Sequence, residues 1–395
     1  MLEKMWMDRH TRGKTRRLYL APAGAAPGSD SPVVGLWWMR CCSGFAAIGI
    51  LAGLVGGCRS GTHQGGEQRP LQIAVIPKGA GGRFWLAIHA GAVKAQRELE
   101  KTGTAVSLRW QGPLSEDDKR GQISIMKMFV DSRVDGIVLA PLDSDGLVPI
   151  TEQCVHSHIP VVIMDSALHT NLAASFVATD NYQGGVVACR RMANLLGGKG
   201  RVLVMRYQIG SASTEAREAG FVNEMQQHPH MTFVLSSGFA GPTVETALAG
   251  SLDTLSALVH PRLTIDGVFT PNESSTVGMR RALRDLGVLH KVRFVGFDSN
   301  PELIDALRSR EIDGLVVQDP LRMGYVGVLS VVKAIRGAPL PRFTDTGAVL
   351  ATPENMSQPG VEELLSPQVD RYLSRESALP RNLAPDLIAE GDSQT

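Results

Sequence analysis

Short hydrogen-bonding side chains follow one apolar run after another along this chain. Each stands at or just beyond the end of a run that reads as a buried strand, and the set is Lys78, Asp165, Thr179, Asp180, Arg206, Asn272, Asp298 and Gln318. In open parallel sheets, ligands bind beyond the carboxyl ends of the strands. Amides and carboxylates can each take part in two hydrogen bonds, which suits the adjacent hydroxyls of a sugar ring. Any single residue could instead cap a helix or form a turn, so the prediction depends on the whole set.

Aromatic residues that could stack on the apolar face of a sugar accompany two of these positions. Phe84 and Trp85 open the helix predicted after Lys78, and Phe297 directly precedes Asp298. Stacked rings of this kind provide contact area on a ligand without requiring a hydrogen bond. For Phe84 and Trp85, a place in the hydrophobic core is the alternative interpretation.

Motifs of the common enzyme and metal-binding classes are missing from the sequence. The first predicted strand is followed by PKGAGGRFW, which does not have the G-x-G-x-x-G spacing of a dinucleotide site. The chain contains no P-loop and no G-x-S-x-G, and its Cys and His residues do not have the spacing of a zinc site. We therefore expect neither an enzyme nor a bound cofactor or metal.

The elements that must position these side chains alternate between strands and helices. The predicted strands are Ile73–Pro77, Val106–Trp110, Gly136–Ala140, Val161–Met164, Ser175–Ala178, Arg201–Met205, Thr232–Ser236, Gly267–Thr270, Arg293–Phe297 and Gly314–Val317. Helical patterns lie between them, including Phe84–Lys101, Ile123–Ser132, Tyr182–Leu196, Thr214–Gln227 and Ser274–Leu286. Continuous apolar strands separated by helices are typical of parallel sheets that are covered on both faces. So many strands favour an α/β protein with two doubly wound lobes over one sheet.

The N-terminal region reads as a secretory signal rather than a domain. Arg40 precedes the apolar stretch FAAIGILAGLV, which leads to small residues and Cys58. An uncleaved membrane helix is the alternative, although a span needs about 20 apolar residues and this stretch is shorter. We expect residues 1–57 to be a signal or upstream segment, with Met39 as a possible start in place of Met1. Residues 58–69 are expected to form a flexible tether.

Charge and cysteine content agree with a secreted body. Seven of the 40 Lys and Arg residues but only three of the 39 Asp and Glu residues precede Cys41. The remainder is slightly acidic, which argues against nucleic acid as a partner. Cys154 and Cys189 fall in predicted helices, and they are either a disulfide pair or, the interpretation we favour, two buried thiols.

Eight segments, in this order, resemble the ribose/galactose-type periplasmic binding proteins, whose type I fold is shared with LacI-type repressors. The segments are IAVIPKGAGGRFWLAIHAGA (73–92), GIVLAPLDS (136–144), IPVVIMDS (159–166), ATDNYQG (178–184), STEAREAGF (213–221), FTPNESSTVGMRRAL (269–283), VGFDSNP (295–301) and VVQDPLRMG (316–324). Cys58, which ends the signal-like segment, similarly resembles the lipidation site of a bacterial lipoprotein signal. The resemblance implies ligand contacts by Phe84, Trp85, Asp165, Arg217, Asn272, Asp298 and Gln318.

The chain also departs from the family pattern. Lys78 stands where the family has a small polar residue, Gly81-Gly82-Arg83 replaces the usual Asn, and Ser166 replaces an Arg. Lys78 could favour an anionic or phosphorylated sugar, or it could pair with Asp165 or Asp298. We include it among the expected ligand-binding residues.

The resemblance also implies a domain organisation. Lobe one is expected at 70–178 plus 319–345, and lobe two at 179–318 plus 346–356. A three-segment hinge would join them near Thr179, Gln318 and Thr344–Gly347. Residues 357–395 are expected to be a mostly disordered tail with one short helix around Val361–Leu365.

The function implied is that of a solute-binding lipoprotein. It would be a monomer that captures a monosaccharide or related polar molecule and delivers it to an ABC permease, held at the membrane by its N-terminal lipid. One alternative is a receptor subunit that hands the bound ligand to a membrane sensor. A LacI-type regulator is a remote alternative, because a helix-turn-helix would have to stand where the apolar signal and the tether lie.

Overall fold

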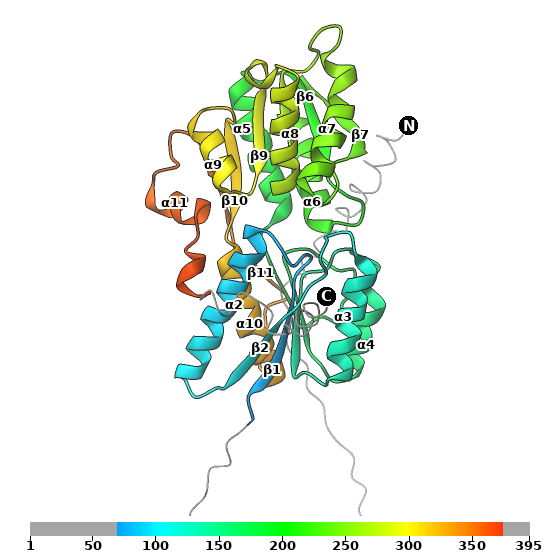
Figure 1. Ribbon diagram of the computed structural model, residues 1–395, viewed down its shortest axis with the longest axis vertical. Coiled ribbons are helices and arrows are strands. Elements are labelled where there is room, and N and C mark those ends of the chain that lie inside the picture. The colour runs from blue at the N-terminus through cyan, green and yellow to red at the C-terminus, as the bar shows by residue number, and fades with distance from the viewer. Residues whose placement is uncertain (1–68, 374–395) are drawn as a thin grey trace, which may run out of the picture. The chain divides into compact units, whose positions relative to one another are not determined.

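Near-continuous apolar runs form the strands of two separate sheets (Figure 1). The computed structural model of the chain describes residues 69–373. The first sheet has the order β11-β5-β4-β3-β1-β2, and all its pairs are parallel. Its strands are β1 (Leu71–Ile76), β2 (Val106–Trp110), β3 (Gly136–Leu139), β4 (Val161–Met164), β5 (Ser175–Ala178) and β11 (Phe343–Asp345).

The second sheet has the order β12-β10-β9-β8-β6-β7, and only its edge strand β12 is antiparallel. Its strands are β6 (Lys199–Arg206), β7 (His230–Phe239), β8 (Gly267–Phe269), β9 (Arg293–Phe297), β10 (Gly314–Gln318) and β12 (Ala348–Ala351). The ends of the ten predicted strands differ from these by at most three residues. The predicted α/β architecture of two doubly wound lobes is therefore confirmed.

Helices cover both faces of the first sheet because side chains of a strand alternate between its faces. Ile73 and Val75 belong to the core under α2 (Arg83–Lys101) and α10 (Pro320–Ile335). Ala74 and Ile76 belong to the core under α3 (Lys119–Asp131) and α4 (Val148–His156). Every one of these four strand side chains is at most 1% exposed, which explains the continuous apolar pattern.

The second sheet is covered in the same way. Helices α5 (Asn181–Leu196) and α6 (Ala212–Met225) pack against each other, as do α7 (Val244–Val259) and α8 (Glu273–Asp285). The short α9 (Pro301–Arg308) and a 3-10 turn, Leu289–Lys291, also belong to this lobe.

The chain passes between the two sheets three times. It leaves the first sheet after β5, returns between β10 and α10, and crosses again between β11 and β12. The strands β11 and β12 were not among the predicted strands. They are short edge strands of three and four residues with mostly exposed or half-buried side chains, so they do not have an apolar signature.

The segment after residue 357 differs from the expected tail. The helix expected around Val361–Leu365 is present as α11 (Pro359–Leu365), and Val361 and Leu365 are buried in the core of the second lobe. Beyond it, Arg97 of α2 donates to the carbonyls of Arg371 and Tyr372, at 3.4 and 2.9 Å. Residues 357–373 therefore pack against both lobes. Helix α11 does so because Val361 and Leu365, four residues apart, share one helix face.

Several expectations lie on residues outside the described range. They concern the signal at 1–57, Cys58, most of the tether and residues 374–395. Within residues 69–373, no helix is both long enough and apolar enough to span a bilayer. Cys154 and Cys189 are free and buried, on α4 of the first lobe and α5 of the second, so they do not form a disulfide. Burial raises the pKa of these thiols to about 11 and about 12.

Candidate ligand-binding site

A cavity of about 360 Å³ lies between the two lobes, and residues at the carboxyl ends of both sheets line it. All eight residues predicted to bind ligand are among its lining residues: Lys78, Phe84, Trp85, Asp165, Arg217, Asn272, Asp298 and Gln318. The volume falls at the small end of the ~300–1,000 Å³ that is typical of ligand pockets. The structure thus brings together side chains that are separated by up to 240 positions in the sequence.

Lys78 lines the cavity on the side of the first lobe and forms an ion pair with Asp165. Its Nζ lies 3.0 Å from Asp165, and both side chains are nearly fully buried. The ammonium also donates to Ser213 Oγ across the cavity at 3.1 Å. Of the two roles that the sequence left open for Lys78, the structure therefore shows the pairing with Asp165.

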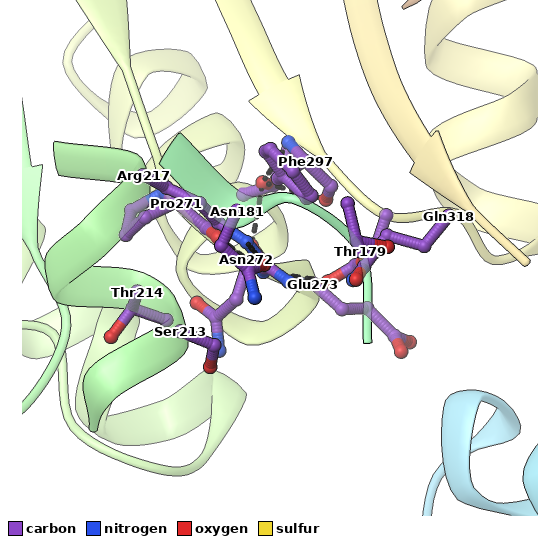
Figure 2. Close-up of polar contacts among 12 residues, drawn as sticks. Thr179, Asn181, Ser213, Thr214, Arg217, Pro271, Asn272, Glu273, Phe297 and Gln318 are labelled. Carbon is purple, nitrogen blue, oxygen red and sulfur yellow. Dashed lines mark hydrogen bonds and ion pairs between the residues drawn. The ribbon is translucent and has the colours of Figure 1, made fainter. Parts of the chain in front are cut away.

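Arg217 is the central cation of the second lobe. The guanidinium stacks on Phe297 with its Cζ 3.9 Å from the ring centroid, donates to Asn181 Oδ1 at 2.9 Å and donates to the carbonyl of Pro271 at 2.8 Å (Figure 2). Its Nη1 lies 3.8 Å from Asp298 Oδ2. Nη2 is buried with no hydrogen-bond partner among the described residues, on a side chain that is 2% exposed.

Asp298 and Gln318 form the neighbouring part of the wall. Gln318 Nε2 donates to Asp298 Oδ1 at 2.7 Å, while Gln318 Oε1 is buried without a hydrogen-bond partner in residues 69–373. Burial raises the pKa of Asp298, against the charge of Arg217. Asp298 does not cap the helix that follows it, because Asn300 does so by accepting from Leu303 N.

Asn272 has the structural role that the sequence left open for it. Its side chain caps α8 in a reciprocal arrangement with Ser275 while it lines the cavity. Its amide nitrogen donates to Ser274 Oγ at 3.2 Å.

Both aromatic residues at the start of α2 line the cavity and also contact the core of the first lobe. Trp85 is 4% exposed and belongs to the core of the first lobe, and Phe84 packs edge-on against it. Trp85 Nε1 donates to Glu116 Oε1 at 2.7 Å. Tyr207 of the second lobe donates to the other oxygen of Glu116 at 3.1 Å, which joins the lobes across the cavity.

Some of the residues that follow strands stay outside the cavity lining. Asp180 caps α5, and Thr179 donates to the carbonyl of Gly347 at the crossing between the lobes. Arg206 donates to the carbonyl of Ser236 and stacks on Phe239. Neither Arg206 nor Phe239 lines the cavity. These positions illustrate the cap and turn roles that any single member of the set could have.

Sequence reasoning missed Glu116, Tyr207, Ser213 and Glu273, which also line the cavity. Tyr207 directly follows β6, so its position after a strand was a usable signal. Glu116 lies in the loop between β2 and α3, six residues beyond the strand, where no local pattern marks it.

Two glycines bring Arg217 into place. A Cβ on Gly185 of α5 would lie 1.9 Å from the Arg217 carbonyl oxygen, and a Cβ on Gly220 would lie 2.0 Å from the Tyr182 carbonyl oxygen. The backbones of α5 and α6 can approach this closely only because neither residue has a side chain. The contact places Arg217 of α6 beside Asn181 of α5, where it lines the cavity.

Comparison with known proteins agrees with this geometry. A family model described as a periplasmic binding protein domain matches residues 73–339. The chain belongs to this family. The periplasmic binding proteins of this family are non-enzymatic solute-binding proteins, and membership implies a periplasmic location.

Curated relatives of this periplasmic binding protein include two proteins named for sugars. The D-ribose/D-allose-binding protein of Pseudomonas aeruginosa is 24% identical over 306 residues, which cover 76% of this chain and 92% of that protein. The ribose import binding protein of Bacillus subtilis is 24% identical over 272 residues, which cover 69% and 84% of the two chains.

Solved structures show the same similarity. An ABC transporter solute-binding protein of Agrobacterium vitis with bound D-fucose is 31% identical, with a TM-score of 0.68 over 74% of this chain and 99% of that one. A carbohydrate transporter solute-binding protein of Agrobacterium radiobacter in complex with D-arabinose is also 31% identical, with a TM-score of 0.68 over 75% and 99%.

Proposed function

We propose that this periplasmic binding protein captures a monosaccharide or a related polyhydroxylated molecule between its lobes for an ABC-type importer. The observation that carries the proposal is the cavity between the lobes, with two buried polar atoms, Arg217 Nη2 and Gln318 Oε1, that have no partner among the described residues. A buried donor and a buried acceptor without partners each destabilise a folded protein by about 1–3 kcal/mol. A ligand with adjacent hydroxyls would supply the missing partner to both.

The buried ion pair supports a binding role in the same way. Burial lowers the pKa of Arg217 and raises the pKa of Asp298, so desolvation outweighs their mutual attraction on both sides. Such a pair contributes little to folding stability. Its charges are better explained as partners for ligand hydroxyls, which bind charged groups more strongly than neutral ones.

Selectivity and closure would come from the same contacts. Lining residues belong to both lobes, so a bound ligand would touch both and stabilise the arrangement in which they meet. An epimer that left Arg217 or Asp298 without its hydroxyl would bind more weakly, because the unpaired group would stay desolvated. The permease would then recognise the ligand-bound form.

We further propose that the protein acts as a monomer and is anchored by lipid on Cys58. The lipid anchor is supported by the apolar stretch and small residues that precede Cys58 in the sequence. The site residues Lys78, Phe84, Trp85, Asp165, Arg217, Asn272, Asp298 and Gln318 are proposed as the ligand contacts.

A thermal-shift screen of the purified protein tests the binding function. The panel contains pentoses, hexoses, deoxy sugars, amino sugars, sugar acids, polyols and phosphorylated sugars. A ligand present at about 1,000 times its Kd stabilises by about 4 kcal/mol, which raises Tm by several degrees. If a folded, ligand-free preparation responds to no member of the panel, the proposal is wrong.

A further inference from the structure

The charged side chains that line the cavity do not balance one another. They are Lys78, Glu116, Asp165, Arg217, Glu273 and Asp298. Lys78 pairs with Asp165 at 3.0 Å, and Arg217 lies 3.8 Å from Asp298. Each cation is therefore matched by one carboxylate, and the carboxylates of Glu116 and Glu273 are left over.

Neither of these two acids forms an ion pair with a cation among residues 69–373. Burial raises the pKa of Glu116, and the charge of Lys78 lowers it without an ion pair between the two. Glu116 accepts from Trp85 Nε1 and from the hydroxyl of Tyr207. Glu273 accepts from Asn300 Nδ2 at 2.8 Å. Within residues 69–373, no Lys, Arg or His nitrogen lies within 4.0 Å of either carboxylate.

The two acids belong to opposite lobes and repel each other. Glu116 follows β2 in the first lobe, and Glu273 is the first residue of α8 in the second. Burial raises the pKa of Glu273 to about 7, and the negative charges of Asp298 and Glu116 also raise it, while Arg83 and the bond from Asn300 lower it. A positive charge bound between Glu116 and Glu273 would remove this repulsion and join the lobes.

Two buried polar atoms without hydrogen-bond partners among the described residues indicate what else the ligand must provide. Gln318 Oε1 requires a donor and Arg217 Nη2 requires an acceptor, on side chains that are 3% and 2% exposed. A hydroxyl can supply either. The cavity therefore combines positions for hydroxyls with a position for a cation. Lys78 already binds Asp165 and Ser213, which leaves one N–H of its ammonium for a ligand.

We propose that the ligand is an amino sugar or amino polyol, with its protonated amine between Glu116 and Glu273 and its hydroxyls on Arg217 and Gln318. This inference rests on the proposed binding function and specifies the class of ligand. It separates this cavity from one that is built for neutral or anionic sugars.

Calorimetric titration with matched sugars tests the proposal. For each of several hexoses, the panel contains the neutral parent, the 2-amino and 6-amino derivatives with protonated amines, and the N-acetylated form of the 2-amino derivative. We expect at least one amino derivative to bind at least about ten-fold more tightly than its parent, which corresponds to about 1.4 kcal/mol. The N-acetylated form should lose this gain, because acetylation removes the charge.

Two near-isosteric variants assign the charge to its residues. E116Q and E273Q each keep an acceptor for Trp85 Nε1 or Asn300 Nδ2, and each removes one negative charge. The measured quantity is the ratio of amine to parent affinity, which should fall several-fold in each variant. The matched control is D117N, which removes an exposed carboxylate next to Glu116 that does not line the cavity, and its ratio should equal that of the unmodified protein.

The outcomes separate this inference from the proposed function. Neutral parents that bind as tightly as every amino derivative would overturn the inference and leave sugar binding standing. An amine preference that persists unchanged in both E116Q and E273Q would overturn the placement of the cation. Failure of the whole panel to bind would overturn the proposed function, and this inference with it.

Discussion

Asp165 and Asp298 occupy equivalent positions in the two lobes. Each is the first residue after its strand, β4 or β9, and each has a left-handed backbone, with φ of 62° and 65°. Each backbone N–H donates to the third residue of the next strand, Asp165 to Val177 and Asp298 to Val316, at 3.0 and 2.8 Å. Left-handed residues other than Gly are uncommon, and Asp is one of the few residue types that tolerate this conformation.

The shared backbone conformation explains how the ends of β4 and β9, one in each lobe, each place a carboxylate in the same cavity. The left-handed residue turns the chain sharply at the end of the strand, so the carboxylate lines the cavity instead of extending the sheet. Residues held in such conformations cluster at functional sites, where the strain is compensated by the rest of the fold. The two carboxylates then receive the two cations, Lys78 in the first lobe and Arg217 in the second.

Loss of either member of the ion pair in the second lobe should weaken ligand binding strongly. R217A and D298A each leave the other charge buried without its partner, which weakens binding by about 2–5 kcal/mol, or at least about thirty-fold. Calorimetry with the sugar found in the thermal-shift screen measures this. Urea unfolding should stay cooperative in both variants. Unchanged affinity in both would refute the site assignment.

A single methyl group at Gly220 should displace Arg217. Its Cβ would lie 2.0 Å from the carbonyl oxygen of Tyr182, so α6 must move away from α5. We expect G220A to destabilise the protein by about 1–3 kcal/mol and to weaken ligand binding. The control is G360A, where a Cβ on α11 meets open space and should leave both quantities nearly unchanged. Equal effects of the two substitutions would show that the helix contact is not tight.

Glu218 should make stability depend on pH. Burial raises its pKa to about 8, with a further rise from Glu215, while the bond from Tyr207 N and the charge of Arg206 lower it. The folded protein therefore binds this proton more tightly than the unfolded chain, whose Glu titrates near ~4.3. The contribution to stability is complete below that pH and is lost as the pH rises towards 8, by up to about 1.4 kcal/mol per pH unit.

E218Q removes this titration while its amide oxygen can still accept from Tyr207 N. The free energy of unfolding, measured in urea at pH 5 and pH 8, should fall less between the two values in E218Q than in the unmodified protein. E363Q removes an exposed carboxylate on α11 and serves as the control. Parallel pH dependence in the unmodified protein and E218Q would mean that Glu218 is ionised at low pH in the fold.

Lipid attachment should depend on one thiol. C58S removes the thiol that would carry the proposed lipid, so the protein should move from the membrane fraction to the soluble fraction of the expressing cell. Fractionation followed by immunoblotting measures the distribution, and C189S, at a buried thiol of the second lobe, is the control. A C58S protein that stays in membranes would favour the uncleaved apolar anchor.

The architecture could be predicted from the sequence because it depends on local patterns. Continuous apolar runs mark strands that are buried on both faces, and residues at their ends mark the edge where ligands bind. The eight residues predicted to bind ligand, all of which line the cavity, were singled out in this way and by the order of the family-like segments. The strands β11 and β12 could not be found, since their exposed side chains do not differ from those of a loop.

The sequence by itself determined the two α/β lobes and the side chains available at their strand ends. Only the tertiary structure decided which partners those side chains take: Lys78 pairs with Asp165, Asn272 caps α8, and Trp85 binds Glu116. Periodicity is a property of neighbouring residues, whereas charge pairing depends on distances between segments far apart in the chain. The two surplus carboxylates of the cavity, Glu116 and Glu273, therefore became visible only once the lobes were placed together.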